Sequence, residues 1–156
     1  MTAPAIALCE APLPYAPLLD ELHAQSFAER WGEEAFASLL ASPGVSALLA
    51  MARKHEGEVP VGFILMRLAA EEAEILTVSV LPKERAKGIG GRLVEGALDA
   101  LRAKGARAVF LEVGLANAPA RQLYERAGFV EIGRRRGYYR NPTGLNEDAV
   151  TLRRAL

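Results

Sequence analysis

The chain has 156 residues, a length that suits a single domain spanning residues 1–156. Its 51% hydrophobic and 24% charged residues are typical of a globular protein, and no apolar run approaches the ~18 residues that a membrane-spanning helix needs. The 19 basic and 19 acidic residues cancel, so no overall field draws the protein to nucleic acid or to a membrane surface, and any anion site must be local.

Cysteine usage and the start of the chain bear on the compartment. Cys9 is the only cysteine, so an internal disulfide is impossible, which fits a reducing environment. Metal-ligand spacing is absent, and residues 1–17 lack the basic leader and apolar core of a signal peptide. We therefore expect a cytoplasmic protein without a metal site.

The first half of the chain reads as one strand, two helices and three strands. Leu18, Leu19, Leu22 and Phe27 recur at helical spacing, and acidic residues in the first turn favour the second helix. The apolar runs that follow have strand character, and Pro82 ends the last of them. The expected elements are strand 5–9, helices 17–27 and 32–41, and strands 46–53, 61–70 and 72–82.

The second half alternates between helix and strand. An amphipathic helix is expected over 91–104, and the nearly all-apolar run 107–113 predicts a strand buried on both faces. Asn117 can cap a further helix that Gly128 ends, and two closing strands follow. These last three elements are expected at 117–128, 129–139 and 148–156. The whole order predicts a mixed α/β sheet with one right-handed crossover in its middle.

A glycine-rich, basic stretch, ERAKGIGGRL at residues 84–93, separates a strand from a helix. Helix N-termini bind phosphate oxygens, and glycines let the backbone approach a ligand. The lysines and arginines here add positive charge: Lys83, Arg85, Lys87 and Arg92. The stretch therefore favours a pyrophosphate ligand over a merely solvated loop. A dinucleotide-binding fingerprint, with Gly88, Gly90 and a ribose contact from Glu112, is a less favoured interpretation of this stretch. The reason is that Leu93 stands at the position of the third glycine.

Residues 85–90 match the pattern [Q/R]-x-x-G-x-[G/A], which resembles the acyl-coenzyme A pyrophosphate loop of the GNAT N-acetyltransferase superfamily. The later segment LEVGLANAPARQLYERAGFVEIGRRRGYY, followed by EDA, is similar to the ribosomal-protein-alanine N-acetyltransferases (RimI-like) within it. The resemblance spans about residues 16–156. It implies the GNAT fold, a central mixed and mostly antiparallel sheet whose parallel strands splay apart, flanked by helices.

The same resemblance implies an acetyl-CoA site. The pyrophosphate would lie on the loop backbone, the pantetheine arm along the preceding strand, and the thioester oxygen on the N–H of Val80. Asn117 matches a cofactor-contacting asparagine, or is a plain helix cap. The implied cofactor-binding residues are Val78, Ser79, Val80, Arg85, Ala86, Lys87, Gly88, Ile89, Gly90, Gly91 and Asn117.

Two residues match the family's catalytic positions. Glu112 would be the general base; it has apolar neighbours, where desolvation strengthens a carboxylate as a base, although a solvent-facing carboxylate is the alternative. Tyr124 would be the general acid, since a phenol of pKa ~10 can protonate a departing thiolate whose parent thiol is near ~8.5. The alternative for Tyr124 is a ring packed in the core.

The resemblance implies an enzyme that acetylates a protein N-terminal α-amino group, with the N-terminal alanine of a ribosomal protein as usual acceptor. Phe27, Trp31, Tyr138 and Tyr139 would border the acceptor, or else pack in the protein, and His23 is expected to face solvent. Three features depart from the family near the acceptor: Gly114, Ala116 and extra residues at 28–30. A small-molecule amine or lysine acetyltransferase and a non-catalytic acyl-CoA-binding module therefore remain alternatives.

Overall fold

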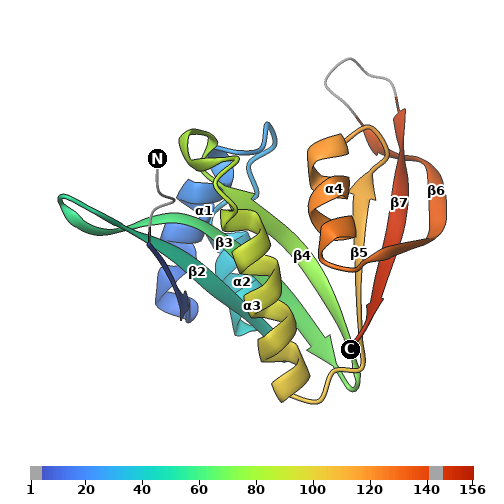
Figure 1. The fold of residues 1–156 in the computed structure, drawn as a ribbon, viewed down its shortest axis with the longest axis horizontal. Coiled ribbons are helices and arrows are strands. Elements are labelled where there is room, and N and C mark those ends of the chain that lie inside the picture. Colours follow the sequence, from blue (N-terminus) through green and yellow to red (C-terminus); the bar gives the residue numbers. More distant parts are fainter. Residues whose placement is uncertain (1–4, 141–145) are drawn as a thin grey trace.

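The computed structural model describes residues 5–140 and 146–156; the side chains of Tyr139, Arg140 and Asn146 lie outside the description. Every predicted helix and strand is present, in the predicted order (Figure 1). The helices are α1 (Ala16–Ala24), α2 (Glu33–Ala41), α3 (Ile89–Ala103) and α4 (Ala118–Arg126). The strands are β1 (Ile6–Glu10), β2 (Val45–Lys54), β3 (Gly57–Ala69), β4 (Glu72–Val80), β5 (Ala108–Gly114), β6 (Val130–Arg140) and β7 (Asn146–Ala155). Short 3-10 helices precede α1 (Leu13–Tyr15) and follow β4 (Pro82–Glu84).

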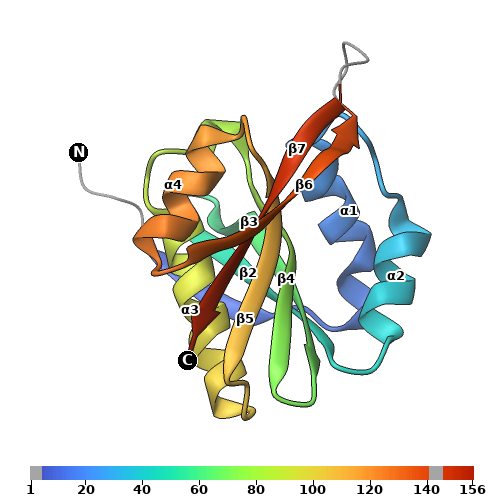
Figure 2. The same cartoon turned by 90° about the vertical axis from the view of Figure 1, so that its right-hand side faces the viewer.

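The strands form one seven-stranded sheet in the order β1-β2-β3-β4-β5-β7-β6. All described neighbours are antiparallel except β4 and β5, which run parallel because α3 crosses over between them. Helices α1 and α2 lie on one face of the sheet, and α3 and α4 lie on the other (Figure 2). The mixed sheet flanked by helices is the fold that the sequence predicted.

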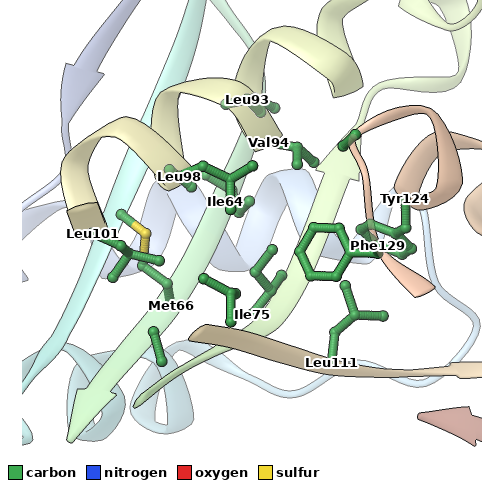
Figure 3. Close-up of a cluster of buried hydrophobic side chains, with 14 of the residues drawn as sticks. Ile64, Met66, Ile75, Leu93, Val94, Leu98, Leu101, Leu111, Tyr124 and Phe129 are labelled. Carbon is green, nitrogen blue, oxygen red and sulfur yellow. The ribbon is translucent and has the colours of Figure 1, made fainter. Parts of the chain in front are cut away.

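Two apolar clusters fill the space between sheet and helices, one on each face. Strand β3 serves both: Ile64 and Met66 face α3, whereas Phe63 and Leu65 face α1 and α2, as expected for alternating side chains. The larger cluster joins α3 to the rings of Tyr124 and Phe129 (Figure 3). Each large side chain buried in this way contributes roughly 1.5–3 kcal/mol. This packing fixes both ends of the β4–α3–β5 crossover.

Several element boundaries differ from the prediction; helix α1, for example, ends at Ala24 rather than at residue 27. Two of the differences have a clear local reason. Helix α3 begins at Ile89 rather than Gly91, since Gly88 takes a left-handed conformation (φ +80°) and forms the N-cap. Strand β3 begins at Gly57, four residues early, and includes Pro60. A register shift opposite Met51 accommodates the missing N–H of that proline.

Within the described part of the chain, no helix is long and apolar enough to cross a membrane. No group of three or more His, Cys, Asp or Glu side chains is arranged to hold a metal ion among those residues.

Candidate active site

Strands β4 and β5 diverge soon after they begin. Their parallel pairing covers three residue pairs and ends at Glu74 and Phe110, and the two ribbons separate beyond that point (Figure 1). The Leu81 N–H donates to the Val61 carbonyl at 2.9 Å, so alternation directs the backbone N–H and C=O groups of Val78 and Val80 away from β3. The open edge of β4 can therefore pair with an extended ligand.

The loop between β4 and α3 presents a row of backbone donors. The N–H groups of residues 86–91 have no backbone acceptor among the described residues. Ala86 (φ +64°) and Gly88 (φ +80°) are left-handed, which turns successive N–H groups toward one side, and Gly91 has open space where a Cβ would be. With the N-terminus of α3 behind it, this loop is suited to bind an anion such as a diphosphate.

A buried ion cluster supports the same loop. The Glu84 carboxylate is 4% exposed and accepts hydrogen bonds from the ammonium groups of Lys54 and, at 2.9 Å, Lys87. These hydrogen bonds, that from Lys54 first, hold the pKa of Glu84 below its ordinary value. Lys54 comes from the end of β2 and was not singled out from the sequence.

The arginines expected to supply local positive charge have internal partners. The Arg85 guanidinium donates to the Val80 carbonyl at 3.2 Å, and the Arg92 guanidinium donates to the Ile6 carbonyl at 3.0 Å. Lys87 is likewise engaged by Glu84. The loop's capacity for an anion therefore depends more on backbone N–H groups than on free basic side chains.

Glu112 lies on β5, on the face opposite the buried Leu111 and Val113. Its side chain is 24% exposed, and Oε1 lies 3.2 Å from the guanidinium of Arg135 on β6. Its Oε2 is buried and has no hydrogen-bond partner among the described residues. One oxygen is thus held by an arginine while the other is available to accept a proton.

Tyr124 lies on α4, with its ring against Phe129 at a centroid distance of 5.8 Å in the large apolar cluster (Figure 3). Its ring packing matches the structural alternative, and its predicted acid role stays a prediction. Asn117 caps α4, because its Oδ1 accepts the N–H of Ala120 at 3.3 Å. The cap is therefore confirmed, and a cofactor contact by the same residue stays a prediction.

Helix α1 ends beside the open edge of β4. The Ser26 hydroxyl donates to the Val80 carbonyl at 3.2 Å. The Ser79 hydroxyl is buried within hydrogen-bonding distance of Ser26 Oγ (2.9 Å) and the Leu22 carbonyl (3.3 Å). The side chain of Ser79 therefore joins β4 to the end of α1, and its predicted cofactor contact stays a prediction.

The aromatic residues predicted near the acceptor, Phe27 and Trp31, come shortly after Ser26 in the chain. Phe27 and Trp31 are 42% and 40% exposed; the Phe27 ring stacks on His23 at a centroid distance of 4.3 Å, and the Trp31 ring packs against His23 in a tilted arrangement at 4.6 Å. The expectation that His23 faces solvent is wrong: its side chain is buried beneath these rings. Burial lowers the pKa of His23, and the charge of nearby Asp20 opposes that shift. The helical position of His23 was predictable, but the covering loop was not.

The far edge of the site comes from β6 and β7. Tyr138 is exposed, and the Arg135 guanidinium lies 5.1 Å from its ring centroid; the side chain of Tyr139 is outside the description. At Gly114, a Cβ would come within 2.5 Å of Glu147 Oε1, which itself accepts the N–H of Ala116 at 2.6 Å. The space of a side chain at position 114 is thus filled by Glu147.

Two shallow surface hollows lie elsewhere, at the opposite end of β4. They have volumes of about 470 and 310 Å³ and are lined by residues of the β3–β4 turn together with Arg107, Phe110 and Arg153. Neither contains a residue of the loop, the diverging edge or the Glu112 environment. The residues that could bind a substrate and react with it therefore lie around the gap between β4 and β5.

Comparison with known proteins supplies independent information. A family model described as acetyltransferase (GNAT) family matches residues 16–129. The ribosomal protein bS18-alanine N-acetyltransferase of Escherichia coli is 30% identical over 136 residues, 87% of this chain and 88% of that protein. The Haemophilus influenzae protein of the same name is 35% identical over 92 residues, 59% of this chain and 62% of that protein, so this match spans less than two thirds of that relative.

Solved structures agree with these sequence matches. The crystal structure of the ribosomal-protein-S18-alanine N-acetyltransferase from Escherichia coli has a TM-score of 0.86 at 26% identity, covering 97% of this chain and 94% of that one. Arabidopsis thaliana NAA60, solved in complex with acetyl-CoA, shares the fold, with a TM-score of 0.85 at 20% identity over 97% and 99% of the two chains. The resemblance expected from the motifs is thereby confirmed.

Proposed function

The chain belongs to the GNAT family of acetyltransferases, and from this premise we propose that it transfers an acetyl group from acetyl-CoA to the N-terminal α-amino group of a protein. The first candidate acceptor is the N-terminal alanine of a ribosomal protein, a substrate that would place the reaction in the cytoplasm. The observation that carries the proposal is the divergence of β4 and β5 between an amide-lined loop and the Glu112 carboxylate.

The residues present fit acetyl-CoA. The backbone N–H groups of residues 86–91 would hold its diphosphate, while Asn117 would contribute a further contact. The open backbone groups of Val78 would pair with its amides, as an added strand does, because the Val80 carbonyl already accepts from Ser26 and Arg85. The Val80 N–H, on the same edge, would donate a hydrogen bond to the thioester oxygen. Bound acetyl-CoA supplies the acetyl group as a thioester.

The side chains of Glu112 and Tyr124 would act as general base and general acid. The acceptor nitrogen forms a bond to the acetyl carbon, and the carbon–sulfur bond breaks. Glu112 Oε2, buried and without a described partner, would take the proton that the nitrogen loses, directly or through water. Tyr124 would donate a proton to the departing thiolate. Arg135 would keep the Glu112 carboxylate oriented through Oε1.

An α-amino group suits this arrangement better than a lysine side chain. Its pKa of ~7.7–8.0 leaves a useful neutral fraction near pH 7, whereas a lysine of pKa ~10.4 demands a stronger base. The E. coli relative is named for an alanine N-acetyltransferase activity on ribosomal protein bS18, which supports a peptide N-terminus. The exposed rings of Phe27, Trp31 and Tyr138, with Tyr139 on the same strand, would border that peptide.

The acceptor class can be tested by acetyl-CoA turnover with short peptides that differ in their first residue. Matched controls are the same peptides with a blocked N-terminus, lysine-containing blocked peptides, and polyamines. We expect turnover with a free N-terminal alanine and none with the blocked peptide. Turnover restricted to polyamines or lysine would overturn the acceptor assignment, and acetyl-CoA binding without any turnover would favour a non-catalytic module.

The base assignment has its own test. Glu112→Gln should lower kcat by roughly 10²–10⁴-fold, because general-base catalysis contributes about that much. Acetyl-CoA affinity, measured by calorimetry, should stay within about twofold, since the loop amides are untouched. Glu95→Gln, at an exposed carboxylate on α3, is the matched control and should leave both quantities unchanged. Equal loss of turnover and affinity in a folded Glu112→Gln protein contradicts the assignment.

A further inference from the structure

A buried carboxylate holds the loop between α1 and α2. Asp20, on α1, is 4% exposed. Its Oδ2 accepts hydrogen bonds from Nε (3.1 Å) and Nη2 (2.7 Å) of Arg30, and its Oδ1 accepts the backbone N–H of Gly32 at 3.1 Å. Gly32 is the N-cap of α2 and has no side chain for that purpose. Asp20 therefore fixes the end of the loop and the start of α2 at once.

These contacts bracket one aromatic residue. Trp31 lies between Arg30 and Gly32, and both of these are bonded to Asp20. The Trp31 ring stacks on Phe36 at 5.3 Å and packs tilted against His23 at 4.6 Å, while Phe27 stacks on His23 at 4.3 Å. Phe27, His23 and Trp31 together form an aromatic wall. The carboxylate of Asp20 therefore determines where the outer ring of this wall lies.

The segment that leads into the aromatic wall is tied to the edge of β4 through Ser26. Ser26 immediately precedes Phe27, and its hydroxyl donates to the carbonyl of Val80, whose N–H faces the diverging strands. Despite the stacking, Phe27 and Trp31 keep about two fifths of their surface exposed. Large aromatic rings held rigidly at such a place supply contact area to a ligand at low entropic cost.

We infer that Asp20 is a positioning residue for the acceptor: it holds Arg30 and Gly32 so that the aromatic wall receives the first residues of the acceptor peptide. This inference rests on the proposed function, which defines the acceptor. Asp20 is bonded to the α1–α2 loop and to nothing described in the diphosphate loop. Its loss should therefore weaken acceptor binding and spare acetyl-CoA.

The kinetic test compares two neighbouring carboxylates. Asp20→Asn keeps the shape of the side chain and removes its charge; Glu21→Gln is the matched control, since Glu21 is exposed and its Oε2 is 3.9 Å from the same Arg30. We expect Asp20→Asn to raise the acceptor KM about tenfold, with kcat and the acetyl-CoA KM within about twofold. Glu21→Gln should behave as wild type. Arg30→Gln, which breaks the same ion pair at an exposed residue, replaces Asp20→Asn if that variant does not fold.

A second measurement needs no acceptor. Trp31 is the only tryptophan, so fluorescence excited at the red edge of tryptophan absorption, where tyrosine does not absorb, reports on the aromatic wall alone. Acrylamide quenching should rise about twofold in Asp20→Asn and stay unchanged in Glu21→Gln. An unchanged acceptor KM in a folded Asp20→Asn protein, or an equal rise in both KM values, would overturn the inference. If the wild type acetylates only another amine, the proposed function fails, and the role of Asp20 is then judged on the KM for that amine.

Discussion

Replacing Gly91 with aspartate should stabilise the protein and weaken acetyl-CoA binding at the same time. Gly91 is the third residue of α3, and no atom lies within 4 Å of the position that its Cβ would occupy. A new side chain would therefore meet no clash. It would also place a negative charge beside the N–H groups that we assign to the diphosphate.

The two effects can be estimated separately. Exchanging a helical glycine for aspartate gains a few tenths of a kcal/mol, or roughly 0.3, in propensity. A carboxylate in the first turn gains about 0.3–1 kcal/mol from the helix dipole. The total of roughly 1 kcal/mol raises Tm by about 2–4 °C in a domain of this size. Against the ligand, a carboxylate about 6 Å from two phosphate charges costs roughly 1.4 kcal/mol at the dielectric constant of water, about tenfold in Kd.

Scanning calorimetry and isothermal titration with acetyl-CoA measure the two quantities. Gly91→Asn is the matched control, because it adds a side chain of the same size without the charge. We expect the Kd ratio between the two variants to shrink as salt rises from about 0.01 M to about 1 M, where the Debye length falls to about 3 Å. Equal Kd values for Gly91→Asp, Gly91→Asn and wild type would refute a diphosphate at this helix start.

Three further predictions concern stability and catalysis. Gly62→Ala should cost roughly 1–3 kcal/mol in chemical denaturation, because its Cβ would lie 2.6 Å from the Ser79 carbonyl oxygen; an unchanged midpoint contradicts this. Glu84→Gln should destabilise the protein at neutral pH, where Glu84 is ionised and its lowered pKa reflects the ion pairs that stabilise the fold. In urea unfolding, the deficit in unfolding free energy relative to wild type should shrink as pH falls below 4.5 and through the lowered pKa of Glu84. A deficit equal at pH ~7 and ~3 excludes the charge as its cause. Tyr124→Phe, which keeps the ring packing against Phe129, should lower kcat by roughly 10²-fold or more, as a pre-steady-state assay can measure; an unchanged kcat contradicts the acid role.

Local signals in the sequence were sufficient for the order of the elements. The helical face of α3 (Leu93, Val94, Ala97, Leu98 and Leu101) is buried as predicted, since a 3.6-residue period already encodes which side meets the sheet. The start of α3 was misjudged by two residues, because the left-handed cap at Gly88 is a backbone property that composition does not reveal. The proline in β3 likewise read as a boundary until a register shift accommodated it.

The residues of the candidate site likewise fall into those that local motifs predict and those that only folding brings together. The glycine loop, Glu112 and Tyr124 could be predicted because they belong to short motifs whose spacing is read directly from the chain. The sequence did not predict contacts between residues that meet only after folding: Lys54 is 30 residues from Glu84, and Ser26 is 54 residues from Val80. His23 was misplaced for the same reason, as rings from a later loop bury it.

By itself, the sequence determined which segments become helix or strand, the family resemblance and the candidate chemistry, because periodicity, turn residues and motifs act over a few neighbouring residues. Only the tertiary structure decided that β4 and β5 part after three residue pairs and that Arg135 holds one oxygen of Glu112. It also decided that Asp20 ties down the loop bearing Trp31. Pairings of this kind depend on which surfaces the packed sheet brings together, and no single segment encodes that.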